Sequence, residues 1–332
     1  MPDNPQTGWG GPAAAAPDLP EVRAAATRVA DVATRTHLAP LHSYADSPDT
    51  YLKPETLQPI GSFKLRGVYN WASSLSPEER NRGLSTTSAG NTAQALGYVA
   101  RLFGTTARTV VPDWLPDNKL QSIINYGATP IKVPSHELMA FMLEERWKQE
   151  PYAYLNPWGE PAMIAGHGTI GLEIFADLPD VDTVFVPVGG GALVCGIGSV
   201  LKALNPDIRI VGVQSEVNPA LAEAFRNGGP VWIDWKPTIC EGASTPLIVD
   251  EMYPLLRQVV DEAALVSEAD ARAAIKRLAL GNKLVAEGAG AISVAAALAE
   301  PQKKRGKAVC IVSGGSIDPE LLASILADVV VQ

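Results

Sequence analysis

The chain has little of what metal centres, disulfide scaffolds and nucleic-acid surfaces require. It holds 3 cysteines and 4 histidines in 332 residues, its aromatic content is 6%, and its formal net charge is -9. The cysteines lie far apart and form no CxxC pair, which excludes a disulfide framework and favours buried thiols in a reducing compartment. The histidines show no ligand spacing, so the sequence predicts no metal site. The acidic balance argues against nucleic acid or an anionic membrane as a partner.

Targeting and membrane signals are also missing. The N-terminus has no basic region followed by an apolar core, so no signal peptide is expected. One uncharged stretch, residues 184–201, is long enough to suggest a membrane span, but it contains Pro187 and five glycines and predicts a strand, a loop and a helix instead. Residues 1–18, rich in Pro, Gly and Ala, are predicted to form a flexible tail. We therefore expect a cytoplasmic globular protein.

The order of the hydrophobic patterns indicates the fold class. A chain of 332 residues, of which 46% are apolar, is long enough for two domains. Short apolar segments typical of strands alternate with helical patterns, and this alternation predicts parallel sheets that are covered by helices on both faces. We predict an α/β fold with two parallel-sheet domains. The large domain is expected over residues 19–66 and 159–332, and the small domain over residues 67–158.

The individual elements follow from the periodicity of the apolar residues. Helices are predicted over residues 20–36, 64–75, 93–103, 118–126, 136–149, 166–178, 194–204, 219–226 and 282–299, and from residue 268 onward. Strands are predicted over residues 50–53, 84–87, 109–111, 129–133, 182–188, 208–214, 265–266 and 307–313. The segment 151–161, rich in Pro, Gly and aromatic residues, is predicted to cross between the domains.

Lys64 is the first candidate for chemistry. It stands in the stretch Gly61-Ser62-Phe63-Lys64-Leu65-Arg66-Gly67, between an aromatic and an aliphatic neighbour. Bulky apolar neighbours remove water from a lysine, and this disfavours the charged form of the amine. A neutral amine is what Schiff-base chemistry with a carbonyl compound requires. From this stretch alone, a solvated surface lysine is the alternative interpretation.

Three consecutive glycines form the second candidate site. Gly189, Gly190 and Gly191 follow a buried strand and precede a helix. Glycines let a phosphate approach the backbone, and the N–H groups at a helix N-terminus point toward an anion. The dinucleotide fingerprint fails because Val194 stands at its sixth position, and no Gly-Lys-Ser/Thr follows. The run predicts a cradle for a single phosphate, and a tight turn without a ligand is the alternative.

Three further features carry suitable chemical groups. The loop Ser88-Ala89-Gly90-Asn91-Thr92 offers hydroxyls, an amide and backbone N–H groups to a carboxylate, although plain N-capping explains it equally well. Ser313 ends the last apolar strand, where a turn serine is the alternative. Glu287 lies among small apolar residues and is either a buried carboxylate or a charge on a helix face.

A desolvated lysine, a cradle for one phosphate and a neutral hydroxyl together suggest pyridoxal 5'-phosphate as the cofactor. On these residues the chain resembles the serine/threonine dehydratase family of pyridoxal-phosphate enzymes, which has the tryptophan-synthase β-like (type II) fold. The resemblance covers roughly residues 36–325 and keeps the order of the family's motifs. The matching motifs occupy residues 61–67, 88–91, 165–169, 186–193 and 313–315.

The resemblance implies a role for each matching residue. Lys64 would form the Schiff base with the cofactor and then act as the base at the substrate's Cα, and Phe63 would flank the ring. Asn91 would hydrogen-bond the 3'-oxygen, and Ser313 would face the pyridine nitrogen. The residues that would hold the phosphate are Gly189, Gly190, Gly191, Ala192 and Leu193. Those that would bind the substrate carboxylate are Ser88, Ala89, Gly90, Asn91 and Thr92.

The chain also departs from the family pattern. Thr92 stands where a histidine is usual, Ala192 replaces a glycine, and Ser316 replaces an asparagine. Racemases of the family carry a serine as a second base at the position of Ala89, and an alanine cannot move a proton. The carboxylates that bind a divalent cation in some relatives would correspond to Gln214 and Ala220, so no metal site is expected.

The expected function is that of a dehydratase, or ammonia-lyase, which converts a β-hydroxy-α-amino acid such as threonine or serine to a 2-keto acid and ammonia. A neutral hydroxyl at the ring nitrogen makes the ring a weaker electron sink, which suits elimination. The alternatives are a bulkier substrate such as 3-phenylserine or 3-hydroxyaspartate, an amino-acid racemase, and a non-catalytic amino-acid-binding protein. We expect a homo-oligomer, a dimer, whose partner is a small amino acid and neither nucleic acid nor a membrane.

Overall fold

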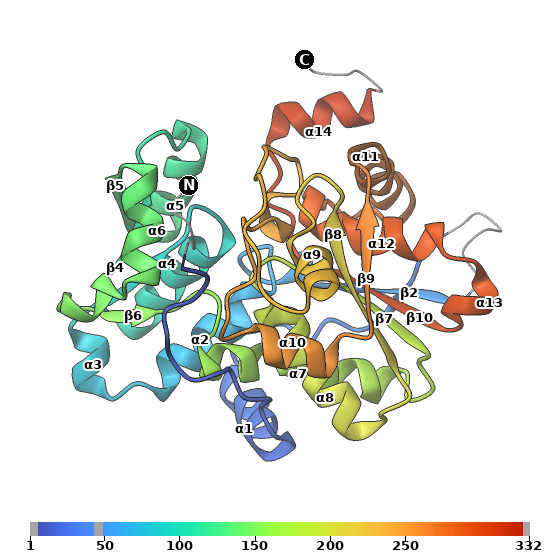
Figure 1. Ribbon diagram of the computed structural model, residues 1–332, viewed down its shortest axis with the longest axis horizontal. Coiled ribbons are helices and arrows are strands. Elements are labelled where there is room, and N and C mark those ends of the chain that lie inside the picture. Colours follow the sequence, from blue (N-terminus) through green and yellow to red (C-terminus); the bar gives the residue numbers. More distant parts are fainter. Residues whose placement is uncertain (1–5, 43–48, 328–332) are drawn as a thin grey trace.

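The strands form two separate sheets, as the computed structural model shows for residues 6–42 and 49–327 (Figure 1). The large sheet has the strand order β1-β2-β10-β7-β8-β9 and the small sheet the order β5-β4-β3-β6. Among the described strands, neighbours run parallel except β1 and β2. The strands are β1 (Ala39–Pro40), β2 (Thr50–Pro54), β3 (Leu84–Thr87), β4 (Ala107–Pro112), β5 (Ala128–Val133), β6 (Ala153–Leu155), β7 (Thr183–Pro187), β8 (Arg209–Ser215), β9 (Glu262–Val266) and β10 (Ala308–Val312). The predicted α/β fold with two parallel-sheet domains is confirmed.

Helices separate most of the strands and cover both sheets. The α-helices are α1 (Leu19–Val29), α2 (Lys64–Ser74), α3 (Pro77–Asn81), α4 (Asn91–Phe103), α5 (Asp117–Tyr126), α6 (Ser135–Leu143), α7 (Pro161–Asp177), α8 (Ala192–Leu204), α9 (Ala220–Asn227), α10 (Tyr253–Val259), α11 (Glu268–Arg277), α12 (Gly288–Ala299), α13 (Gln302–Arg305) and α14 (Pro319–Leu326). Short 3-10 turns lie at Glu55–Leu57, Arg146–Gln149 and Glu241–Ala243, and a π-helical turn at Leu278–Asn282. In the part of the chain that the structure describes, no helix combines the length and the apolar character needed to cross a bilayer.

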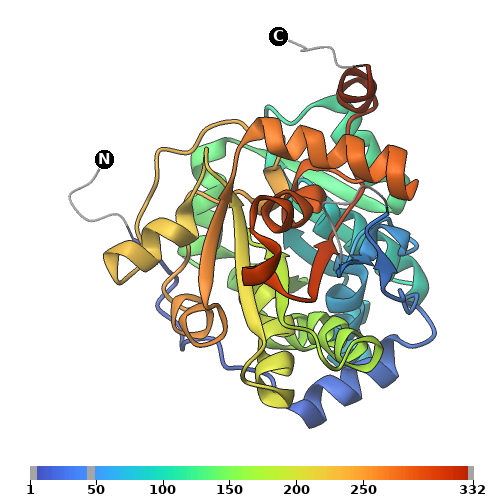
Figure 2. The same ribbon diagram turned by 90° about the vertical axis from the view of Figure 1, so that its right-hand side faces the viewer.

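The large sheet separates two hydrophobic cores. Val184 and Val186 of β7 join one core together with residues of α7 and α8, whereas Phe185 between them joins the other core with residues of α11 and α12. Successive side chains of a strand point to opposite faces of a sheet, so a wholly apolar strand must be covered on both sides. Figure 2 shows this sheet with helices on either side. The cysteines Cys195 and Cys310 lie in these opposite cores as unpaired thiols.

Two predicted helices have different ends in the structure. The predicted helix 20–36 stops at Val29, because Thr34 is drawn into tertiary hydrogen bonds: its N–H donates to Gln58 Oε1 at 2.9 Å, and its carbonyl accepts from Gln58 Nε2 at 2.8 Å. The helix predicted to start at residue 166 starts instead at Pro161, after the N-cap Glu160. The glycines of this motif therefore lie within α7, where a side chain at Gly166 would come within 2.6 Å of the Arg66 carbonyl oxygen.

Two irregular regions also differ from the prediction. The segment predicted to cross between the domains contains β6, which pairs with β3 in the small sheet. In place of the predicted helix 282–299, the structure has an α-helix that begins only at Gly288. Residues 283–287 do not continue into it, because Lys283 adopts φ 60° and the Glu287 N–H donates to the Gly314 carbonyl at 3.0 Å. Helix α6 also ends at Leu143, before the predicted end at residue 149.

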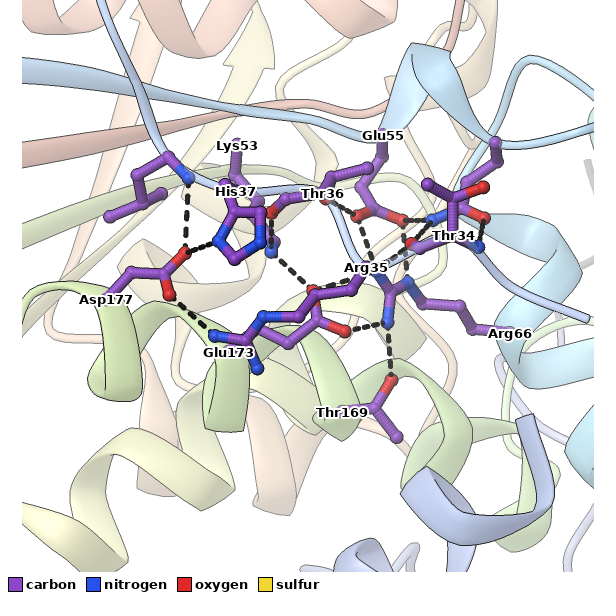
Figure 3. A network of polar contacts seen from close by, with 12 residues as sticks. Thr34, Arg35, Thr36, His37, Lys53, Glu55, Arg66, Thr169, Glu173 and Asp177 are labelled. Atoms are coloured by element: carbon purple, nitrogen blue, oxygen red, sulfur yellow. Dashed lines mark hydrogen bonds and ion pairs between the residues drawn. The ribbon is translucent and has the colours of Figure 1, made fainter. Parts of the chain in front are cut away.

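A buried ion network joins the large sheet to α2 and α7 (Figure 3). Arg66 donates through Nε to Glu55 Oε2 at 2.8 Å and through Nη1 to Glu173 Oε1 at 2.7 Å. Lys53 forms an ion pair with the same Glu173 and also donates to the Thr36 carbonyl. The side chains of Lys53, Glu55 and Arg66 are at most 1% exposed. Burial alone would raise the pKa of the Glu55 carboxyl, but the Arg66 guanidinium holds that pKa below its usual value.

The N-terminal segment lies between the two domains, where the dark blue trace runs in Figure 1. The Gly10 N–H donates to Glu251 Oε1 at 2.7 Å in the large domain, and Gln6 Nε2 donates to the Leu143 carbonyl at 3.0 Å in the small one. Residues 1–5 of the predicted flexible tail lie outside the described residues, as do residues 328–332 at the other end. The predicted tail and the predicted domain boundaries at 18, 66 and 158 stay predictions.

Candidate active site

Lys64 and Ser313 are brought together by two loops that pair with each other. The Phe63 N–H donates to the Ser313 carbonyl at 3.0 Å, and Ser62 and Gly314 form an antiparallel bridge. Gly61 adopts φ 70°, a conformation that favours glycine, so it permits the turn that leads from β2 into α2. Lys64 is the first residue of α2, and its Nζ lies 5.1 Å from the centroid of the Phe63 ring. The end of β10 and the start of α2 therefore meet at the position of the candidate lysine.

The glycine run connects β7 to α8 with its backbone accessible. Gly191 is the N-cap of α8 with φ 102°, and no side chain caps the helix. The first N–H groups of a helix have no partner within the helix, and the helix dipole favours an anion there. A Cβ at Gly189 would come within 2.8 Å of the Gly242 carbonyl oxygen, and one at Gly190 would overlap the indole of Trp158. Glycine is therefore required by space at both positions.

Most of the candidate residues line one cavity. It is lined by Phe63, Lys64, Pro157, Pro187, Gly189, Gly190, Gly191, Ala192, Leu193, Gly242 and Ser313. The structure thus places the candidate lysine, the phosphate cradle and the candidate serine around a single space. A larger pocket between α11 and α12 contains none of these residues and is separate from this site.

The Lys64 amine is tuned by its surroundings. Burial lowers the pKa of the amine from 10.5 to about 8, although the Glu287 carboxylate opposes the shift. Lys64 keeps some exposed surface because it lines the cavity, while protein atoms enclose it on the other sides. Its interpretation as a solvated surface charge is therefore wrong. At about pH 7, roughly a tenth of such an amine is neutral and nucleophilic.

The segment from Ser88 to Thr92 runs from the end of β3 into α4 and is not among the residues that line the cavity, but Asn91 contacts residues close to Ser313. Asn91 Nδ2 donates to Glu287 Oε1 at 2.8 Å, and Ser316 Oγ donates to Asn91 Oδ1 at 2.7 Å. Plain capping by Asn91 is excluded, because the N-cap of α4 is Gly90 and Asn91 is its first helical residue. Ser88 instead receives a hydrogen bond at its Oγ from the Gly90 N–H at 3.3 Å.

Glu287 is a partly buried carboxylate at the start of α12 and not a charge on a helix face. It is the N-cap residue of α12, and a side chain at Gly314 would overlap its carboxylate. Burial raises the pKa of its carboxyl to about 7, and the hydrogen bond from Asn91 opposes this shift. A carboxyl group of this kind can exchange a proton near neutral pH.

The sequence assigned no role to two neighbours of this site. Trp158 covers Gly190 from the segment between β6 and α7. His167 is fully buried, its ring lies 4.8 Å from that of Phe63 in an edge-on arrangement, and neither of its ring nitrogens has a hydrogen-bond partner among the described residues. Burial lowers the pKa of His167 well below its usual value, so its ring is neutral and acts as an aromatic support for Phe63. The sequence signal that could have pointed to them is their position next to glycines: Trp158 precedes Gly159, and His167 lies between Gly166 and Gly168.

No group of three or more His, Cys, Asp or Glu side chains with the geometry of a cation site occurs among residues 6–42 and 49–327.

Comparison with known proteins gives a consistent result. The profile of the family described as "Pyridoxal-phosphate dependent enzyme" matches residues 29–314. The L-threonine ammonia-lyase of Thermotoga maritima is 39% identical over 311 residues, which are 93% of this chain and 78% of that protein. The family profile spans Lys64, the glycine run and Ser313.

Two solved structures share the architecture over almost their full length. Processed threonine deaminase isoform 2 from Solanum lycopersicum superposes with a TM-score of 0.84 and 29% identity, covering 98% of this chain and 95% of that one. Maize serine racemase superposes with a TM-score of 0.85 and 28% identity, covering 95% and 98%. These neighbours confirm the predicted tryptophan-synthase β-like fold, and the predicted cofactor is confirmed by the family. The chain belongs to the pyridoxal-phosphate dependent enzymes, and within them to the serine/threonine dehydratase family of ammonia-lyases.

Proposed function

We propose that this enzyme removes water from a β-hydroxy-α-amino acid, with L-threonine or L-serine as the substrate, and releases a 2-keto acid and ammonia. The observation that carries the proposal is the single cavity in which the Lys64 amine, the glycine run and Ser313 meet. Relatives named as threonine ammonia-lyases support the same reaction.

The residues around the cavity fit pyridoxal phosphate. An aldehyde requires an amine that loses its proton readily, and burial lowers the pKa of Lys64 to about 8. A phosphate requires N–H groups that have no other partner, and the start of α8 has no side-chain cap. A pyridine nitrogen is suited by a hydroxyl, and Ser313 lines the same space with only 4% of its surface exposed.

The bound cofactor supplies an electron sink that stabilises negative charge at the substrate's Cα. Lys64 would hold the cofactor in the resting enzyme, and its amine, once released, would take the proton from the substrate's Cα. Loss of this proton and of the β-hydroxyl breaks the Cα–H and Cβ–O bonds, and the resulting enamine tautomerises and takes up water to give the keto acid and ammonia. The N–H groups at the start of α8 would hold the phosphate, and the loop from Ser88 to Thr92 would bind the substrate carboxylate.

Ser313 favours elimination over reactions that need a long-lived carbanion. Its Oγ donates to the Ala289 carbonyl at 3.4 Å. A hydroxyl carries no charge that would keep the pyridine nitrogen protonated, as a carboxylate would. The ring therefore withdraws electrons less strongly, and a departing β-hydroxyl relieves the charge at Cα.

Racemisation is the second candidate function, because a serine racemase is a close structural neighbour. Inversion at Cα requires a second group that moves a proton on the opposite face of the substrate. In the loop that we assign to the substrate carboxylate, Ala89 occupies the position where the family's racemases carry a serine, and its methyl group cannot serve as a base. The site therefore supports single-base elimination better. The homodimeric state and the cytoplasmic location stay predictions.

The test is 2-keto acid release from a panel of β-hydroxy amino acids. The panel contains L- and D-serine, L-threonine and its allo isomer, 3-hydroxyaspartate and 3-phenylserine. We expect L-threonine or L-serine to give keto acid with the highest kcat/KM. If only 3-phenylserine or 3-hydroxyaspartate gives keto acid, the dehydratase reaction is supported and the proposed substrate is wrong. Inversion of an amino acid without keto acid would contradict the dehydratase function and favour the racemase.

Cofactor capture by the apoprotein should depend on pH in a defined way. Only the neutral Lys64 amine attacks the aldehyde, and burial lowers its pKa to about 8. The capture rate should therefore rise about tenfold from roughly pH 7 to pH 9 and level off above that, because most of the amine is then neutral. Stopped-flow absorbance of the bound cofactor measures this rate. A rate that continues to rise tenfold for each pH unit would show an ordinary lysine and contradict this assignment.

A further inference from the structure

The Asn91 side chain is held by hydrogen bonds at both ends of its amide. Its nitrogen donates to Glu287 Oε1 at 2.8 Å, and its oxygen accepts from Ser316 Oγ at 2.7 Å. An asparagine amide has two N–H donors, so one donor remains after the bond to Glu287. Among the described residues, no protein group accepts from this second N–H. It is available to a bound molecule.

The two neighbours of Asn91 differ in what they can specify. The Ser316 hydroxyl donates or accepts equally well, so it would tolerate the amide in either orientation. An ionised carboxylate only accepts, and it would face the amide oxygen unfavourably if the amide were rotated by half a turn. Glu287 therefore decides which end of the Asn91 amide points away from Ser316.

The position of Glu287 is itself fixed by the backbone. Its N–H donates to the Gly314 carbonyl at 3.0 Å, and its carboxylate lies against Gly314, where a side chain would overlap it. The charges that act on the Glu287 carboxyl are Glu241, which opposes its ionisation, and Lys119 and Lys64, which favour it. Lys119 and Glu241 form an ion pair with each other across the two domains. The carboxyl ionises near neutral pH and is charged in mildly alkaline buffer.

We infer that Glu287 is a positioning residue, which holds the Asn91 amide nitrogen toward the phenolic oxygen of pyridoxal phosphate. The inference rests on the proposed function and on the role at that oxygen which the family resemblance implies for Asn91. Because Glu287 acts through Asn91, its removal has no effect when Asn91 is already absent. Ser316 supports the same orientation from the other side of the amide and contributes less, because its hydroxyl does not discriminate between the two ends.

The test compares Glu287→Gln, Asn91→Ala, Ser316→Ala and the double variant of Glu287→Gln with Asn91→Ala, at about pH 8.5 where the carboxyl is ionised. The matched control is Glu268→Gln, since Glu268 is also a carboxylate with hydrogen-bond partners, the Thr238 hydroxyl and the Ile239 N–H at 3.2 Å. Two properties are measured that do not depend on turnover: the dissociation constant of the cofactor from the apoprotein, and the share of bound cofactor in its yellow form.

We expect Glu287→Gln to weaken cofactor binding about tenfold and to reduce the share of bound cofactor that is yellow. The reason is that the Asn91 amide, no longer oriented by a charged carboxylate, loses its hydrogen bond to the phenolic oxygen. The double variant should bind the cofactor no more weakly than Asn91→Ala alone. Ser316→Ala should bind the cofactor about threefold more weakly than the wild type. Glu268→Gln should behave as the wild type. If Glu287→Gln does not fold, Glu287→Asp replaces it, because the shorter side chain keeps the charge but withdraws it from Asn91, and the same loss of cofactor affinity is expected.

Two results would overturn the inference. One is a Glu287→Gln variant with the cofactor affinity and spectrum of the wild type. The other is a double variant whose losses add up, because Glu287 would then act on the cofactor without Asn91. The proposed function has a separate readout: a wild type that binds the cofactor and turns yellow but releases no keto acid would contradict the dehydratase, and the comparison of variants would still decide the role of Glu287.

Discussion

Replacing Lys64 with alanine is expected to lower 2-keto acid release by at least about 10³-fold and to leave the purified protein colourless. Loss of a base that takes part in the transition state alone costs about 10²–10⁴-fold. The same change removes the amine that holds the cofactor, so both functions fail together. The structure supports one amine for both tasks, because Lys64 lines the cavity beside the glycine run. Keto acid assays and absorption spectra of the purified variant measure the two effects.

The control is Lys132→Ala, which removes an exposed lysine from β5 of the small domain. This variant should keep the activity and the colour of the wild type. A Lys64→Ala variant that stays yellow would show that another lysine captures the cofactor. A variant that keeps more than about a tenth of the activity would show that another group takes the Cα proton, which would contradict the proposed mechanism.

Replacing Glu55 with alanine is expected to lower the free energy of unfolding by about 3–5 kcal/mol, because two buried cations, Arg66 and Lys53, would then share the one carboxylate of Glu173. Arg66 would lose both bonds to the Glu55 carboxylate, at 2.8 and 2.9 Å. Lys53, whose side chain is 0% exposed, is paired with the same Glu173 and would lose the favourable nearby charge of Glu55. Cofactor binding should weaken as well, since Arg66 follows Lys64 by two residues on α2. Urea unfolding of the apoprotein measures the stability.

Glu144→Ala is the control for this prediction. Glu144 forms an ion pair with Arg146 at 2.8 Å, but both side chains are about half exposed, and such pairs contribute about 0–1 kcal/mol. The loss of unfolding free energy for Glu55→Gln should lie between those for Glu55→Ala and Glu144→Ala. Glutamine keeps the shape and part of the hydrogen bonding of Glu55 but loses its charge. A loss below about 1 kcal/mol for Glu55→Ala would mean that water or a shifted side chain compensates the cations.

The sequence was informative where the chemistry depends on local residue type. Glycines between a strand and a helix, and a lysine between apolar neighbours, are patterns with a physical reason, and the structure places them around one cavity. The two-sheet fold followed from the alternation of strand and helix patterns. Such inferences work because backbone N–H groups, turn conformations and strand periodicity are set within a few residues.

Contacts between distant segments could not be predicted. The partner of Asn91 is Glu287, 196 residues away, and the sequence left open whether Glu287 was buried or exposed. The first helix ends early because Thr34 is bonded to Gln58 and Arg66, which local propensity does not include. Strand β6 forms because β3 offers it an edge, although its own three residues lie in a Pro- and Gly-rich segment. Tertiary contacts override local preference in each of these cases.

The most direct test of this account is to locate the lysine that holds the cofactor. Borohydride reduction of the purified enzyme fixes pyridoxal phosphate to its lysine, and mass spectrometry of the digested protein identifies the residue. We predict a single modified site at Lys64. Modification of Lys53, Lys119 or any other lysine, with Lys64 unmodified, would contradict the assignment of the active site.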